Sequence, residues 1–171
     1  MEFLTITDRK TDLTAFTLDF SDDITRGVEF LDNEVGSEEW LLHINPELLD
    51  VRSGNSCVCG QVFQRHYSEG MERLVGRQET TISPRAQDAL SHAHGFSIDT
   101  EHSDEYSLFR DAYLAQENVT VDSENYYTEL DNAEQWAWSC LTEQWISTCR
   151  KLIADRGLAF KVSAAWEKQS A

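Results

Sequence analysis

The sequence predicts an α+β fold, in which a predominantly helical domain carries a small antiparallel sheet. Two stretches near the N-terminus, Glu2–Thr7 and Leu13–Phe20, are rich in threonine, isoleucine and phenylalanine, which favour strands, and a polar segment separates them. They are interpreted as a β-hairpin. Leu158–Trp166 alternates loosely between apolar and polar residues and is a candidate third strand beside that hairpin. Most of the chain between these stretches has apolar residues at helical spacing.

Ordinary start and stop signals delimit the helices. Serine, aspartate or asparagine stands before several of the periodic segments, where its side chain can accept a hydrogen bond from a free backbone amide, and glycine follows several of them. Ser103 is the expected cap of one helix, and Ser83-Pro84 opens another. The predicted helical segments are residues 21–33, 38–44, 46–49, 57–67, 84–94 and 104–117. Gly36 is expected to break the first of them, and the buried side of the last is expected to consist of Tyr106, Phe109 and Tyr113 with the stem of Arg110.

The longest predicted helix runs from Asp131, where Glu134 stands at the capping-box position, to Arg156, and Gly157 ends it. Its apolar residues recur at steps of three and four, which predicts that this helix is the central packing element of the domain. These residues are Trp138, Leu141, Trp145, Cys149, Leu152 and Ile153.

Trp136 lies about 180° around this helix from Trp145, at about 100° per residue, on a face that is otherwise mostly polar. Two interpretations are open. In the first, a neighbouring element such as the segment with Tyr126 and Tyr127 covers the indole. In the second, the indole is exposed and anchors a partner, since tryptophan is enriched among interface anchors.

The chain has 171 residues and is interpreted as one globular domain, residues 1–171. Its strongest global feature is charge, with 31 acidic residues against 14 basic ones and a net charge of −17. Residues 19–50 hold ten acids and one arginine, residues 99–134 hold eleven acids and one arginine, and residues 57–98 are neutral. Such a surface repels nucleic acids and anionic membranes and attracts a basic protein surface, although it also increases solubility without any partner.

The stretch that most resembles a signature is Leu48–Phe63. Cys57 and Cys59 are separated by one residue, which places them about 200° apart on the predicted helix and outside the usual spacing of zinc ligands. Cys59 is therefore interpreted as a small buried apolar residue, whereas Cys57 shares the opposite face with Gln61. The sequence contains no secretory signal, so we expect all four cysteines to be reduced thiols of a cytoplasmic protein.

A series of residues in the middle of the chain stands in a fixed order: Trp40, Ile44, Leu48-Leu49-Asp50-Val51, Cys57-Val58 and Gly60-Gln61-Val62-Phe63, then Gly95-Phe96 and Tyr106-Ser107-Leu108-Phe109. This series resembles a pattern in small uncharacterised proteins of actinobacterial bacteriophages. The similarity spans roughly residues 38–116 and is most specific in Cys-Val-x-Gly-Gln. Cys59 departs from the pattern, which has an aliphatic residue there. The resemblance implies a phage origin and brings no activity, cofactor or catalytic residue.

The sequence contains none of the common phosphate-binding, dinucleotide-binding, nucleophile-elbow or metalloprotease motifs. We therefore predict no catalytic residue, no cofactor and no metal, and we do not expect an enzyme. We expect a phage-encoded acidic accessory protein that binds and modulates a host protein with a basic surface in the host cytosol, without contacting nucleic acid or membrane. The candidate partner-binding residues are Asp104, Glu105, Asp122, Glu124 and Trp136.

Three other functions remain open from the sequence. The acidic blocks fit a nucleic-acid mimic that occupies the site of a host DNA-binding protein. A metal module or an enzyme built on Cys57, Cys59 and the histidines is the second alternative. A minor virion component is the third alternative. The sequence does not predict the oligomeric state.

Overall fold

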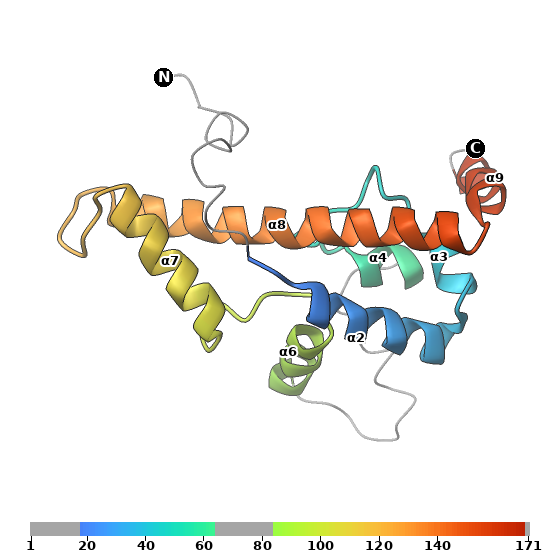
Figure 1. The fold of residues 1–171 in the computed structure, drawn as a ribbon, viewed down its shortest axis with the longest axis horizontal. Coiled ribbons are helices and arrows are strands. Elements are labelled where there is room, and N and C mark those ends of the chain that lie inside the picture. The colour runs from blue at the N-terminus through green and yellow to red at the C-terminus, as the bar shows by residue number, and fades with distance from the viewer. Residues whose placement is uncertain (1–17, 64–83, 170–171) are drawn as a thin grey trace. The chain divides into compact units, whose positions relative to one another are not determined.

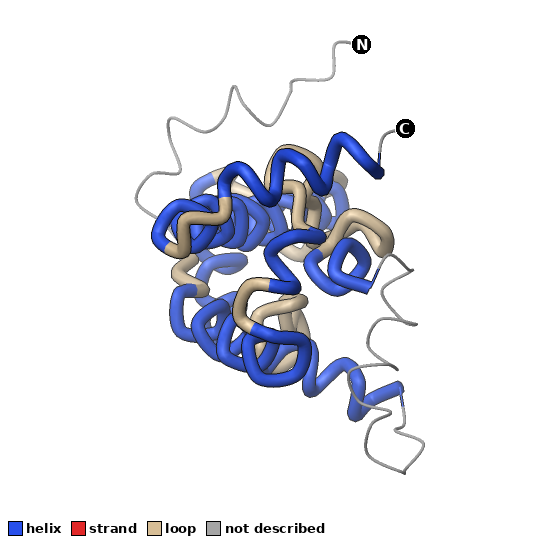
Figure 2. The backbone as a smooth tube through the Cα atoms, turned by 90° about the vertical axis from the view of Figure 1, so that its right-hand side faces the viewer, coloured by secondary structure: helices blue, strands red, loops and turns tan. Residues whose placement is uncertain are grey.

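A computed structural model describes residues 18–63 and 84–169. In these residues the chain consists of helices joined by turns and loops, and they contain no β-strand (Figure 2). The predicted α+β fold with an antiparallel sheet is therefore wrong, because the described part of the chain is helical. The hairpin segments Glu2–Thr7 and Leu13–Phe20 lie outside the described residues, apart from residues 18–20, which form no strand.

The candidate strand Leu158–Trp166 is instead helical, and most of it belongs to α9 (Ala159–Gln169). Leu158 and Val162 are both buried and stand four residues apart, which is about one turn of a helix as well as an even step along a strand. The three alanines of α9 favour the helix. Gly157, at φ +66°, has the left-handed conformation that commonly ends a helix.

The described chain forms two compact units. Unit 1 comprises residues 18–19 and 98–140, and unit 2 comprises residues 20–63, 84–97 and 141–169. The longest helix, α8 (Tyr126–Asp155), contributes its first half to unit 1 and its second half to unit 2. Among the described helices, none combines the length and the apolar character needed to cross a membrane.

Unit 2 contains five helices of its own besides the second half of α8, and most of their bounds agree with the sequence prediction (Figure 1). Gly36, at φ +122°, is the last residue of a π-helical turn that follows the first of these helices, so the predicted stop lies about one turn beyond the end of that helix. The elements are α2 (Ser21–Leu31), the π-helical turn Asp32–Gly36, α3 (Glu39–His43), α4 (Val58–Phe63), α6 (Pro84–Ala93) and α9.

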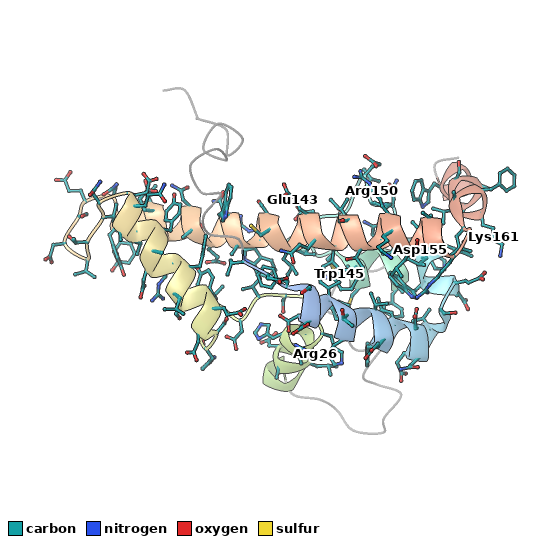
Figure 3. All side chains as sticks on the ribbon, in the orientation of Figure 1. Arg26, Glu143, Trp145, Arg150, Asp155 and Lys161 are labelled. Atoms are coloured by element: carbon teal, nitrogen blue, oxygen red, sulfur yellow. The ribbon has the colours of Figure 1, made fainter. Side chains whose placement is uncertain are left out.

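Trp145 is the centre of the core of unit 2 and is fully buried. Its indole N–H donates to the carbonyl oxygen of Gly95 at 2.6 Å, and its ring stacks on Phe96 with centroids 5.8 Å apart. Figure 3 shows the side chain pointing from α8 towards α2 and α6. Gly27 of α2 lies so close that an added Cβ would stand 2.3 Å from the carbonyl oxygen of His94 and 2.9 Å from the Trp145 ring.

A polar cluster fixes the C-terminal end of α8 within unit 2. Both carboxylate oxygens of Asp32 accept hydrogen bonds from Arg156, at 2.9 and 2.7 Å, and one also accepts from the indole N–H of Trp40 at 2.7 Å. The hydrogen bond to Asp32 raises the pKa of Arg156 above its already high ordinary value. Because this two-point contact is about three-quarters buried, it holds α8 more firmly than the exposed ion pairs nearby.

Unit 1 is built on α7 (Asp104–Gln116) and the first half of α8. The Ser103 hydroxyl accepts a hydrogen bond from the backbone amide of Tyr106 at 3.1 Å, so the predicted cap is confirmed. The predicted buried side of α7 is also confirmed, since Tyr106, Phe109 and Tyr113 are all buried.

The start of α8 differs from the prediction, because this helix begins at Tyr126 rather than at Asp131. Glu129, in the first turn of α8, is buried and accepts a hydrogen bond from the Tyr113 hydroxyl of α7 at 3.0 Å. This contact between α7 and α8 is possible because the helix begins before Asp131. Asn125 stands directly before Tyr126 and is a residue type that favours the N-cap position, so a local start signal was present. Asp131 lies inside the helix and accepts a hydrogen bond from Gln135 at 2.6 Å.

Candidate functional site

The signature stretch forms a loop, residues 45–57, that the start of α4 holds in place. The side-chain amide of Gln61 binds both ends of this loop. Its oxygen accepts from the backbone N–H of Asn45 at 2.6 Å, and its nitrogen donates to the carbonyl oxygens of Ser56 at 2.9 Å and Asn45 at 3.4 Å. Gln61 therefore acts as a clamp that closes the loop.

Gly60 and Cys57 complete this clamp. An added Cβ at Gly60 would stand 2.6 Å from the carbonyl oxygen of Gly54 and 2.7 Å from that of Asn55, so only glycine fits there. The Cys57 thiol accepts from the backbone N–H of Gly60 at 3.2 Å and donates to the carbonyl oxygen of Gly54 at 3.6 Å. The Cys-Val-x-Gly-Gln motif is thus explained by the packing of one loop.

The sequence assigned Cys57 and Cys59 to opposite faces of a helix, and it expected only Cys59 to be buried. Both are buried, because the loop covers the side on which Cys57 lies. Burial raises the pKa of Cys57, and it raises the pKa of Cys59 well above its ordinary value. Protonated, covered thiols are poor nucleophiles and poor metal ligands. Among the described residues, no group of three or more histidine, cysteine or acidic side chains is placed to hold a metal ion.

Alkaline pH is expected to destabilise the fold through a third buried thiol. Burial raises the pKa of Cys149 from 9.0 to about 12, so above pH 9 the unfolded chain loses this proton while the folded chain keeps it. The unfolded state then binds fewer protons, and the free energy of unfolding falls as pH rises, by about 1.4 kcal/mol per pH unit for one such thiol. Urea unfolding at about pH 8 and about pH 10 measures the fall. In Cys149→Ala the fall should be about 1.4 kcal/mol smaller than in the wild type; an equal fall contradicts this assignment.

The structure places the four predicted carboxylates in unit 1, where all of them are exposed. Asp104 and Glu105 lie in the first turn of α7, and Asp122 and Glu124 lie in the loop between α7 and α8. No described residue forms an ion pair with any of the four. The first pair lies at the start of α7, which is about 20 Å long at 1.5 Å per residue, and the second pair follows the end of this helix.

Trp136 is closer to the first of its two predicted environments, in which a neighbouring element covers the indole. The residue is half-buried, so it is neither enclosed on all sides nor presented as a protruding anchor. Its indole nitrogen is buried and has no hydrogen-bond partner in the part of the chain that the structure describes. The structure therefore gives no direct support to Trp136 as the main contact residue.

Three exposed apolar side chains in unit 1 escaped the sequence analysis. Leu108 is 72% exposed on α7, Val121 is 74% exposed in the following loop, and Tyr127 is 81% exposed at the start of α8. The signal for Leu108 is present in the sequence, because it stands opposite the predicted buried side of α7. Val121 and Tyr127 carry no such signal, since their exposure depends on the course of the loop and on the early start of α8.

Comparisons of the chain with protein-family models, with curated proteins and with solved structures found no match. The resemblance to actinobacteriophage proteins therefore remains a prediction.

Proposed function

We propose that this chain is a non-catalytic binding protein and that unit 1 presents the contact surface to a protein with a basic surface. In keeping with the resemblance to phage proteins, the partner is a host protein in the host cytosol, and binding modulates its activity. The proposal extends the sequence-based hypothesis by replacing Trp136, as the principal anchor, with Leu108, Val121 and Tyr127.

The observation that carries the proposal is the combination of exposed apolar side chains with the four predicted carboxylates, none of which forms an ion pair with a described residue. Three of the five large apolar side chains that are exposed in the described chain belong to unit 1. In unit 1 the only lysine or arginine among the described residues is Arg110, and Asp111 pairs with it at 2.9 Å. Exposed apolar side chains provide binding energy, and the carboxylates around them favour a basic partner and speed its approach.

In unit 2, unlike unit 1, several exposed basic side chains form ion pairs with acidic side chains. Its exposed cations face acids of the same unit: Arg150 pairs with Glu47 at 2.6 Å, and Lys161 pairs with Glu38 at 3.0 Å. Figure 3 shows Arg150 pointing away from α2 and α6, on the side of α8 opposite to Trp145. Unit 2 is therefore closer to internal charge balance: its described residues include 13 acidic and 8 basic ones, a net charge of −5, whereas those of unit 1 include 12 acidic and one basic, a net charge of −11.

A nucleic-acid mimic would have a continuous row of carboxylates at phosphate-like spacing. Exposed carboxylates also lie between the two predicted pairs, at Asp111 and Glu117, but the exposed apolar side chain of Leu108 among them fits a protein partner better than a phosphate mimic.

Neutralising the four predicted carboxylates is expected to abolish capture of the partner. The variant Asp104→Asn, Glu105→Gln, Asp122→Asn, Glu124→Gln removes charge with little change in shape. Lysine is unsuitable, because Asp104 and Glu105 lie in the first turn of α7, where a positive charge opposes the helix dipole. Affinity purification from an actinobacterial host lysate with mass spectrometry is the measurement, at low salt and at about 0.3 M salt, where exposed charges are screened.

The matched control neutralises four exposed carboxylates of unit 2, two of which also lie in a first helical turn. They are Asp22, Glu29, Glu39 and Asp88. We expect the control to capture the same proteins as the wild type and the unit 1 variant to lose one of them. Identical capture by all three proteins, or a loss shared by both variants, contradicts a binding role for unit 1.

A further inference from the structure

The outer face of α7 carries a short apolar seam. One side of the helix packs into the core of unit 1 through Tyr106, Phe109 and Tyr113. Leu108 lies in the middle of the opposite side. Ala112 and Ala115 follow Leu108 at i+4 and i+7, on the same side of the helix; Ala115 is exposed and Ala112 is half-buried. This seam covers about two helical turns.

Carboxylates flank the seam on both sides. Taking Leu108 as the origin and 100° per residue, Asp104 and Asp111 lie about 40° and 60° to one side, and Glu105 lies about 60° to the other. All three are exposed, and only Asp111 has a cationic partner among the described residues. An apolar seam at i, i+4 and i+7 with charged flanks is the pattern by which one helix packs along another.

We propose that α7 binds an amphipathic helix of the partner, in which lysine or arginine residues flank an apolar seam. This inference rests on the proposed function and specifies the shape of the partner. The small side chains of Ala112 and Ala115 let a second helix approach closely, Leu108 enters its apolar seam, and the flanking carboxylates pair with its basic residues. The complementary charge selects a basic helix over an acidic one.

The test uses the full chain and two synthetic peptides of about 18 residues, or five helical turns, with the same leucine and lysine composition. One peptide has leucine at heptad spacing, and in the other the order is scrambled so that no apolar seam forms. Fluorescence anisotropy measures the Kd of each peptide. The variants are Leu108→Ser and, as a matched control, Leu48→Ser, because Leu48 is 66% exposed in unit 2.

We expect the patterned peptide to bind about tenfold more tightly than the scrambled one, the difference that burial of part of one leucine side chain provides. Leu108→Ser should remove this preference, and Leu48→Ser should keep it. Circular dichroism melting should be nearly unchanged in both variants, since both side chains are exposed.

Equal affinities of the wild type for the two peptides, or a preference that survives in Leu108→Ser, overturn the docking of a helix on α7. The four-carboxylate variant of unit 1 separates this failure from that of the proposed function. If it loses affinity for both peptides while the unit 2 control does not, unit 1 still binds basic partners and only the helical geometry is wrong. If it binds both as tightly as the wild type does, the proposed function fails as well.

Discussion

Replacing Trp145 by alanine is expected to lower the free energy of unfolding by about 3–5 kcal/mol, the usual loss for a large buried aromatic side chain. The substitution empties the centre of unit 2, removes the stacking on Phe96 and leaves the carbonyl oxygen of Gly95 without its donor. The cavity left by the indole cannot collapse easily, because the backbone of Gly27 in α2 already packs against the backbone of His94, directly after α6. Urea unfolding followed by circular dichroism measures the loss.

Trp136→Ala is the comparison for this experiment. Trp136 lies on the same helix and is half-buried, and its indole nitrogen makes no hydrogen bond with the described residues. The change should therefore reduce the free energy of unfolding by clearly less than the loss at Trp145, since less apolar area leaves the interior and no paired donor is removed. Equal losses in the two variants would show that Trp145 is not the packing centre of the protein.

Gly60→Ala is expected to destabilise the protein by about 1–3 kcal/mol or more, as other changes that overfill a packed site do. In an unobstructed helix the same change would stabilise by about 1 kcal/mol, because alanine is the better helix former. Here the new Cβ would meet the carbonyl oxygens of Gly54 and Asn55 at 2.6 and 2.7 Å, and both belong to backbone that the Gln61 clamp fixes. Urea unfolding measures the effect, and we expect a lower urea midpoint in Gly60→Ala than in the wild type. A higher midpoint would disprove the clamp.

Local signals predicted much of the described fold. The bounds of α2, α3, α6 and α7 follow from residues that act within one turn of the chain, such as Ser103 at the start of α7 and Gly95, at φ +64°, after α6. Two errors concern other segments. The segment after Gly157 has an apolar spacing that suits a strand or a helix, and the first turns of α8 include Glu129, which accepts a hydrogen bond from Tyr113 of α7.

The candidate site was predicted only in part, because some of its features follow from local sequence and others depend on contacts between distant segments. Charge is a property of composition, so the sequence located the acidic block of unit 1, but it could not show that Asp104 lies at the start of α7 and Asp122 after its end. Exposure of an apolar residue is a property of packing. Leu108 could be inferred from helical phase, whereas Val121 and Tyr127 required the structure.

The clamp on the signature loop grips only main-chain atoms. Gln61 binds the amide and carbonyl groups of Asn45 and Ser56, and Gly60 abuts carbonyl oxygens. The side chains of Leu48 and Asn55 are exposed and take no part in these contacts. The backbone conformation of this loop therefore does not depend on the amino acids at these two positions. Combinatorial libraries randomised at both positions should keep the loop conformation, which makes this chain a scaffold for presenting varied side chains at one defined site.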